Sequence, residues 1–110
     1  MRMAMRILRV AVLAAALVAA GSFGATAAQY TIVVAQMKFG PVPAVLHPGD
    51  TIVWQNDDIL RHSATARDKS FDLDLPAKSS ATMTVGAAGT VAFYCKFHPG
   101  MTGTLVITPP

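Results

Sequence analysis

The chain has 110 residues, of which 53% are hydrophobic and 14% are charged, and its formal net charge is +3. Three of the nine basic residues lie close to the N-terminus, and the other six are balanced by six acidic residues, all of them aspartates. The rest of the chain therefore has almost no net charge, which excludes an electrostatic footprint for nucleic acid. Composition and charge alone therefore do not indicate the function, and individual side chains have to be considered.

The first 28 residues have the pattern of a secretory signal peptide. Three arginines precede an apolar run over residues 10–20, and residues 25–28 are small enough for cleavage. The run is shorter than the roughly 18 apolar residues that a membrane-spanning helix requires. We therefore expect a signal helix over residues 1–28, export to the periplasm and one mature domain over residues 29–110. An uncleaved N-terminal anchor is the alternative.

Short extended segments with turn residues between them make up the mature chain. They are expected at residues 30–35, 44–46, 51–54, 71–75, 81–85, 90–95 and 103–108. Residues 64–70 have only a weak pattern and are expected to form a loop. A turn is expected at Pro48-Gly49-Asp50, because proline presets φ and glycine supplies a positive φ. Without an amphipathic helix, this order predicts an all-β Greek-key β-sandwich.

The only cysteine of the chain lies among other metal-ligating side chains. Cys95, His98 and Met101 are separated by two residues each. An odd cysteine in an exported protein is either a free thiol or a metal ligand. Two imidazoles, a thiolate and a weak axial thioether form an electron-transfer copper site, and the second imidazole is expected from His62. The predicted ligands of one copper ion are His62, Cys95, His98 and Met101.

The expected fold explains how these side chains could act together. Cys95 ends an expected strand, His98 and Met101 lie in the loop that follows, and His62 comes from a different loop. The protein would then impose one compromise geometry on both oxidation states of copper. Little reorganisation would accompany gain or loss of an electron, which is the functional value of such a site.

Two stretches of the sequence resemble the cupredoxins, the blue copper proteins of the plastocyanin and amicyanin group. The first is VLHPGDTIVWQN at residues 45–56, with His62 after it, and the second is YCKFHPGMTGTL at residues 94–105. The short ligand loop is most similar to that of amicyanin. The resemblance covers residues 30–108 and implies a β-sandwich with one type 1 copper ion and one-electron transfer between redox proteins.

The sequence departs from the family pattern on both sides of the first histidine. The family usually has proline before it and asparagine after it, where this chain has Arg61 and Ser63. The asparagine normally joins the two ligand loops by hydrogen bonds, and the serine hydroxyl and backbone can do part of this. Arg61 and Lys96 add positive charge near the site, which would favour a redox partner with an acidic docking surface.

Other polar side chains are interpreted as structural. His47 precedes a turn and is expected to be exposed, not a metal ligand. Asp57 and Asp58 resemble a pair of catalytic carboxylates, but aspartates in a turn usually make local hydrogen bonds. Tyr94 is expected to point to the opposite side of its strand from Cys95.

The sequence therefore predicts a soluble, monomeric periplasmic protein that carries single electrons between a redox donor and a redox acceptor. It is predicted to have no enzymatic activity and no stable membrane insertion after signal cleavage. The alternative is a periplasmic copper chaperone or storage protein, although such proteins tend to use exposed methionine and histidine sets. A multicopper enzyme needs more than the three histidines present, and a binuclear copper centre needs a second cysteine.

Overall fold

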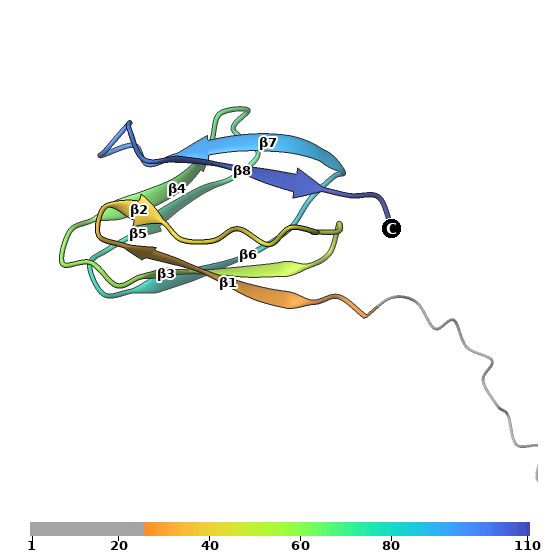
Figure 1. Ribbon diagram of the computed structural model, residues 1–110, viewed down its shortest axis with the longest axis horizontal. Helices are drawn as coiled ribbons and strands as arrows, with labels where there is room; N and C mark the ends of the chain where they lie inside the picture. Colours follow the sequence, from red (N-terminus) through yellow and green to blue (C-terminus); the bar gives the residue numbers. More distant parts are fainter. Residues whose placement is uncertain (1–25) are drawn as a thin grey trace, which may run out of the picture.

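The computed structural model describes residues 26–110, and the regular structure in this part of the chain consists of β-strands (Figure 1). The predicted signal helix and residues 1–25 of the predicted signal peptide lie outside the described residues. Between residues 26 and 110, no helix has the length and hydropathy that crossing a membrane requires.

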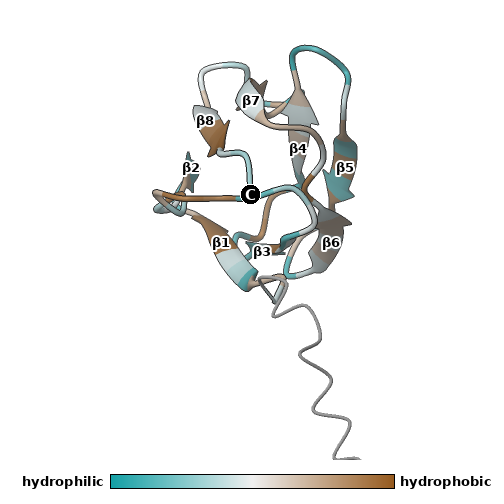
Figure 2. Ribbon diagram, turned by 90° about the vertical axis from the view of Figure 1, so that its right-hand side faces the viewer, coloured by the Kyte–Doolittle hydropathy of each residue, from teal (hydrophilic) through white to brown (hydrophobic). Residues whose placement is uncertain are grey.

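Eight strands form two four-stranded sheets. They are β1 (Gln29–Ala35), β2 (Lys38–Phe39), β3 (Thr51–Asn56), β4 (His62–Ala66), β5 (Asp72–Leu75), β6 (Ser80–Thr84), β7 (Gly89–Tyr94) and β8 (Thr102–Ile107). One sheet has the order β2-β1-β3-β6, and the other has the order β5-β4-β7-β8. The chain crosses between the sheets after β3, β5 and β6, and Figure 2 shows the sheets facing each other. The predicted β-sandwich is confirmed.

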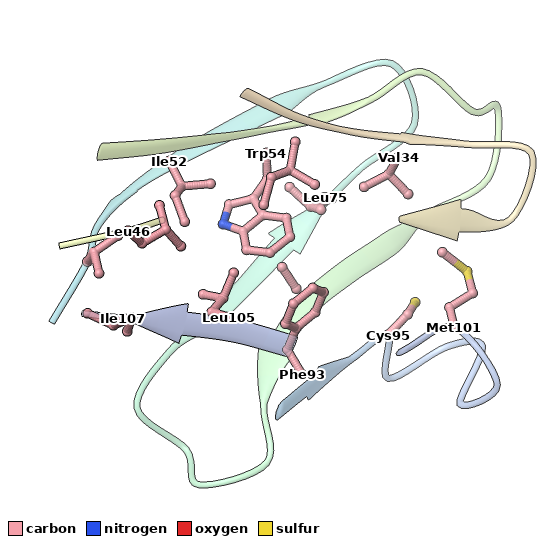
Figure 3. Packing of buried hydrophobic residues seen from close by; sticks show 13 residues of the cluster. Val34, Leu46, Ile52, Trp54, Leu75, Phe93, Cys95, Met101, Leu105 and Ile107 are labelled. Carbon is pink, nitrogen blue, oxygen red and sulfur yellow. The ribbon is translucent and has the colours of Figure 1, made fainter. Parts of the chain in front are cut away.

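An aromatic cluster fills the space between the sheets. The rings of Trp54 from β3 and Phe93 from β7 are fully buried, with their centroids 5.1 Å apart in an edge-to-face arrangement (Figure 3). Gly103 lies directly opposite Phe93 on β8. A Cβ atom at Gly103 would lie only 2.2 Å from the Phe93 ring, so this position has room for the ring only because it is glycine.

The expected loop over residues 64–70 is wrong for residues 64–66, which belong to β4. Every residue of β4 is buried, and the strand lies between β5 and β7 in its sheet. Its sequence, His-Ser-Ala-Thr-Ala, combines polar residues with alanine only, and alanine has a low preference for strands, so the usual pattern of large apolar residues is missing. His62 accordingly begins a strand, where a loop position was expected.

Two smaller differences concern the segment between β1 and β3. Residues 38–39 pair with β1 as β2, although they lie between the expected segments 30–35 and 44–46. Phe39 contributes to the core here, with its ring centroid 4.8 Å from that of Phe93. In the apolar run at 44–46, Leu46 makes only an isolated bridge to Ile107. The turn at residues 48–50 forms as expected, with Gly49 at φ 90°.

The topology brings two connections to the same end of the sandwich. The β3–β4 connection, residues 57–61, and the β7–β8 connection, residues 95–101, lie together at the end opposite the C-terminus (Figure 1). Strand β3 ends before the first connection and β7 ends before the second, so rigid strands deliver both segments to this end. The predicted ligand residues lie in or next to these two connections.

Candidate metal centre

Three predicted ligands converge at this end of the sandwich. The Nδ1 atoms of His62 and His98 are 3.2 Å apart, and the Cys95 Sγ atom lies 3.8 Å from the first and 3.7 Å from the second. His62 and Cys95 are buried, and His98 is half-buried. Among residues 26–110, this is the one group of at least three histidine, cysteine or acidic side chains with metal-binding spacing.

Backbone hydrogen bonds shape the β7–β8 connection around the cysteine. Cys95 N–H donates to the Met101 carbonyl at 3.0 Å, and Met101 N–H donates to the His98 carbonyl at 2.8 Å. His98 N–H donates in turn to the Cys95 carbonyl at 3.3 Å. The three residues are thereby held in one tight loop directly after β7.

Met101 places a second sulfur atom at the same end of the core. Its side chain is only 6% exposed and belongs to the hydrophobic cluster that also contains Cys95. Figure 3 shows both sulfur atoms at one end of this cluster, beyond the Phe93 ring. This location is suitable for a weak thioether ligand.

One metal ion fits between the three close donors. Bonds from zinc to nitrogen are about 2.0 Å and to sulfur about 2.3 Å, so an ion can join donors up to about 4 Å apart. The separations of 3.2, 3.7 and 3.8 Å satisfy this condition. Two imidazoles and a thiolate, with a buried thioether nearby, suit copper. The donor set therefore fits one copper ion.

Asp58 contacts the other nitrogen of the buried histidine. Its Oδ2 atom lies 2.7 Å from His62 Nε2, and its carboxylate accepts hydrogen bonds from the N–H groups of Gln36 and Met37. The hydrogen bond from Met37 N–H is the main cause that lowers the pKa of Asp58, and the hydrogen bond with the His62 ring is the next. The sequence analysis interpreted Asp58 as a turn residue and missed this contact. A spacing of four residues before His62 does not by itself predict that the two side chains meet.

Ser63 joins the two ligand segments, as its position after His62 indicated. Its hydroxyl accepts a hydrogen bond from Lys96 N–H at 2.8 Å, and its own N–H points to the Cys95 Sγ atom at 3.4 Å. The hydroxyl also contacts Thr65 Oγ1 at 2.9 Å, and Thr65 donates to Asp72. Ser63 therefore connects the two ligand segments through its hydroxyl group and also donates a hydrogen bond to the sulfur atom.

Replacing Ser63 by alanine is expected to lower the free energy of unfolding by about 1–3 kcal/mol. The change leaves the part-buried Lys96 N–H without its acceptor, and an unsatisfied buried donor has a destabilising effect of this size. Urea denaturation measures the effect. Ser79→Ala is the matched control, because this hydroxyl bonds to the Pro76 carbonyl in an exposed turn. Equal effects of the two substitutions would contradict a stabilising role of the hydrogen bond between Lys96 N–H and the Ser63 hydroxyl.

The two cationic side chains next to the site are paired with carboxylates. Arg61 makes two hydrogen bonds to Asp74, at 2.8 and 3.2 Å, and its guanidinium lies 4.5 Å from the centre of the Phe97 ring. Lys96 contacts Asp72 at 2.9 Å. The hydrogen bonds from the guanidinium lower the pKa of Asp74. The two pairs leave little net charge on this side of the site.

Three other side chains that were interpreted from the sequence lie outside the group of metal-binding side chains. His47 has a side chain 43% exposed, next to Asp50 and outside the group of metal-binding side chains, as expected. Tyr94 is half-buried, and the Arg67 guanidinium lies 4.6 Å from the centre of its ring. Asp57 accepts a hydrogen bond from Gln55, which agrees with a local structural role.

The fold is similar to solved structures of amicyanin. The reduced Cu(I) form of a proline-to-glycine variant is 26% identical to this chain, with a TM-score of 0.61. The reduced state of a proline-to-phenylalanine variant is 24% identical, with a TM-score of 0.62. Each comparison covers 73% of this chain and 82% of the amicyanin chain. No curated protein matches the sequence.

The model of one protein family matches residues 8–107, and its description is a cupredoxin-like domain. This match covers most of the chain and includes both ligand segments. The matched residues contain all eight strands of the sandwich. The chain belongs to the cupredoxin-like family.

Proposed function

We propose that this protein is a blue copper electron carrier in which His62, Cys95, His98 and Met101 bind one copper ion. The observation that carries the proposal is the triangle of two Nδ1 atoms and one Sγ atom with sides of 3.2, 3.7 and 3.8 Å. A bound copper ion would supply a one-electron Cu(II)/Cu(I) couple.

The way the ligands are held supports electron transfer. His62 starts β4 and Cys95 directly follows β7, so both positions are fixed by the sheet. Three backbone hydrogen bonds hold His98 and Met101 in a closed loop. A rigid donor set resists the change of geometry that copper prefers on changing its charge, and this keeps reorganisation small. The site has no substrate chemistry of its own, so we propose no enzymatic activity.

His98 provides the route for electrons to leave the site. It is the most exposed of the three close donors, and exposed apolar side chains lie in the two connections at this end of the sandwich. Ile59 is 80% exposed and Leu60 47% in the β3–β4 connection, and Phe97 is 43% exposed in the β7–β8 connection. Such a patch suits brief contacts with a redox donor and a redox acceptor. The acidic docking surface predicted for the partner would meet little free charge, because Arg61 and Lys96 are paired.

We also propose that the protein acts as a monomer in the periplasm. The support for export is the residue pattern of positions 1–28, which has a basic start, an apolar run and small residues for cleavage. Expression of the full chain in a bacterium, followed by fractionation and mass measurement of the product, tests this location. A full-length protein in the cytoplasm would contradict it.

Spectroscopy of the copper-loaded protein tests the proposed function. We expect one copper ion per chain, an intense visible band from thiolate-to-Cu(II) charge transfer, and reversible bleaching by a one-electron reductant. The alternative of a copper chaperone or store predicts instead a Cu(I) protein without this band, which gives its metal rapidly to a chelator. A colourless protein after loading with Cu(II) would refute the electron carrier.

A further inference from the structure

We propose that Asp58 is the positioning residue of the metal centre. Its carboxylate fixes the orientation of the His62 ring and increases the preference of the site for Cu(II) over Cu(I). This inference rests on the proposed function. It assigns a role to a residue that lies outside the predicted ligand set and whose sequence position indicated only a turn.

The two ring nitrogens of His62 have separate partners. Nδ1 faces the Nδ1 atom of His98 at 3.2 Å and the Cys95 Sγ atom at 3.8 Å, whereas Nε2 lies 2.7 Å from the Asp58 carboxylate. A histidine that binds a metal through Nδ1 carries its proton on Nε2, so this N–H donates to the carboxylate. The ring is fully buried, and its orientation is therefore fixed by the contacts at its two nitrogens.

The Asp58 carboxylate is itself held in place from a different part of the chain. Its Oδ1 atom accepts from Gln36 N–H at 2.8 Å, and its Oδ2 atom accepts from Met37 N–H at 3.1 Å. Both residues have a left-handed backbone, with φ of 52° and 60°, in the turn between β1 and β2. The Asp58 backbone N–H donates to the buried Asn56 side chain at 2.9 Å. These contacts leave the carboxylate little freedom to move away from His62.

The second histidine lacks an equivalent partner within residues 26–110. The hydrogen bonds of the His98 ring in this part of the chain run through Nδ1, to His62 and Cys95. The centre is therefore asymmetric. One imidazole is buried with an anionic hydrogen-bond acceptor, and the other lies at the surface where electrons would pass.

A negative charge next to a ligand stabilises the more positive oxidation state of the metal. The charge-assisted hydrogen bond makes the His62 imidazole a stronger donor, and outer-shell partners of this kind change metal affinity by about 10–100-fold. The electrostatic part of this effect is larger for Cu(II) than for Cu(I), because the interaction grows with ionic charge. Asp58 is thus expected to lower the reduction potential.

Asp58→Asn tests this role in the full-length, copper-loaded protein. We expect the Cu(II) affinity to fall about tenfold more than the Cu(I) affinity, measured by competition with chelators of each ion. A tenfold change in this ratio raises a one-electron potential by about 59 mV, which redox titration measures independently. Asp57→Asn is the matched control, since it removes the same charge one residue earlier, where the carboxylate contacts Gln55 and no ligand.

The outcomes separate a charge effect from a purely structural one. Equal losses of Cu(I) and Cu(II) affinity in Asp58→Asn, or an equal shift of potential in Asp57→Asn, would overturn the inference. If the variant does not fold, nuclear magnetic resonance of the unaltered Cu(I) protein provides the test. A slowly exchanging His62 Nε2–H proton is expected, and rapid exchange would overturn the inference.

The test also separates this inference from the proposed function. An unaltered protein that has the visible band, together with an unshifted potential in Asp58→Asn, refutes the role of Asp58 alone. An unaltered protein that lacks the band refutes the electron carrier itself, whatever the variant shows.

Discussion

Cys95→Ser is expected to abolish the intense visible band of the copper-loaded protein. The band requires a thiolate bound to Cu(II), and Cys95 is the only cysteine in the chain. A serine hydroxyl is a hard, weakly acidic donor that does not replace a soft sulfur ligand. Copper loading followed by visible absorption and electron paramagnetic resonance measures the effect. A Cys95→Ser protein that remains blue would refute the assignment of this residue as a ligand.

Met101→Leu is the matched control for this substitution. It removes the other sulfur atom near the site and keeps a buried apolar side chain of similar volume, so stability should change by less than about 1.5 kcal/mol. The axial ligand mainly tunes the potential of such a site. We therefore expect the visible band to remain and the reduction potential to move. A potential equal to that of the unaltered protein would argue against Met101 as the axial ligand.

Phe93→Ala is expected to have the largest effect on folding, with a loss of about 3–5 kcal/mol in the free energy of unfolding. The ring is fully buried and packs against the rings of Phe39, Trp54 and Phe71 between the two sheets. Such a loss is a large fraction of the stability of a small domain. Denaturation with urea of the copper-free protein measures it without a contribution from metal binding. A loss below about 1 kcal/mol would contradict the central place of this ring.

The same ring explains a second expected loss, at Gly103. Gly103→Ala would place a Cβ atom 2.2 Å from the Phe93 ring, so overpacking should destabilise the fold by about 1–3 kcal/mol. In a Phe93→Leu background the obstacle is smaller, and the effect of Gly103→Ala should decrease. Gly86→Ala is the control, because a Cβ atom there meets no atom within 4 Å. Equal effects at the two glycines would contradict this account.

Much of the metal centre could be predicted from residue types and spacing. A single cysteine with a histidine and a methionine at short intervals indicated one soft site, and the structure brings Cys95 and His98 together with His62. The role of these side chains as ligands stays a prediction. The β-sandwich could also be predicted, because alternating segments with turn residues between them are a local property of the sequence.

The parts that could not be predicted depend on long-range packing. Strand β4 was missed because its apolar positions are alanines, which have a low preference for strands. The contacts of Asp58 could not be predicted because its backbone donors come from the β1–β2 turn, which the parallel pairing of β1 with β3 brings next to residue 58. Neither the β1–β2 turn nor the pairing of β1 with β3 can be recognised from the residues near Asp58.

The placement of the chain ends has a consequence for how the protein would meet its partners. Strand β1 starts, and the described chain ends after β8, at the end of the sandwich opposite the β7–β8 connection (Figure 1). If the N-terminal segment stayed in the membrane as a tether, it would hold the molecule by its base. The electron-exchanging face would then point away from the lipid, so a bound form and a released form could serve the same redox proteins.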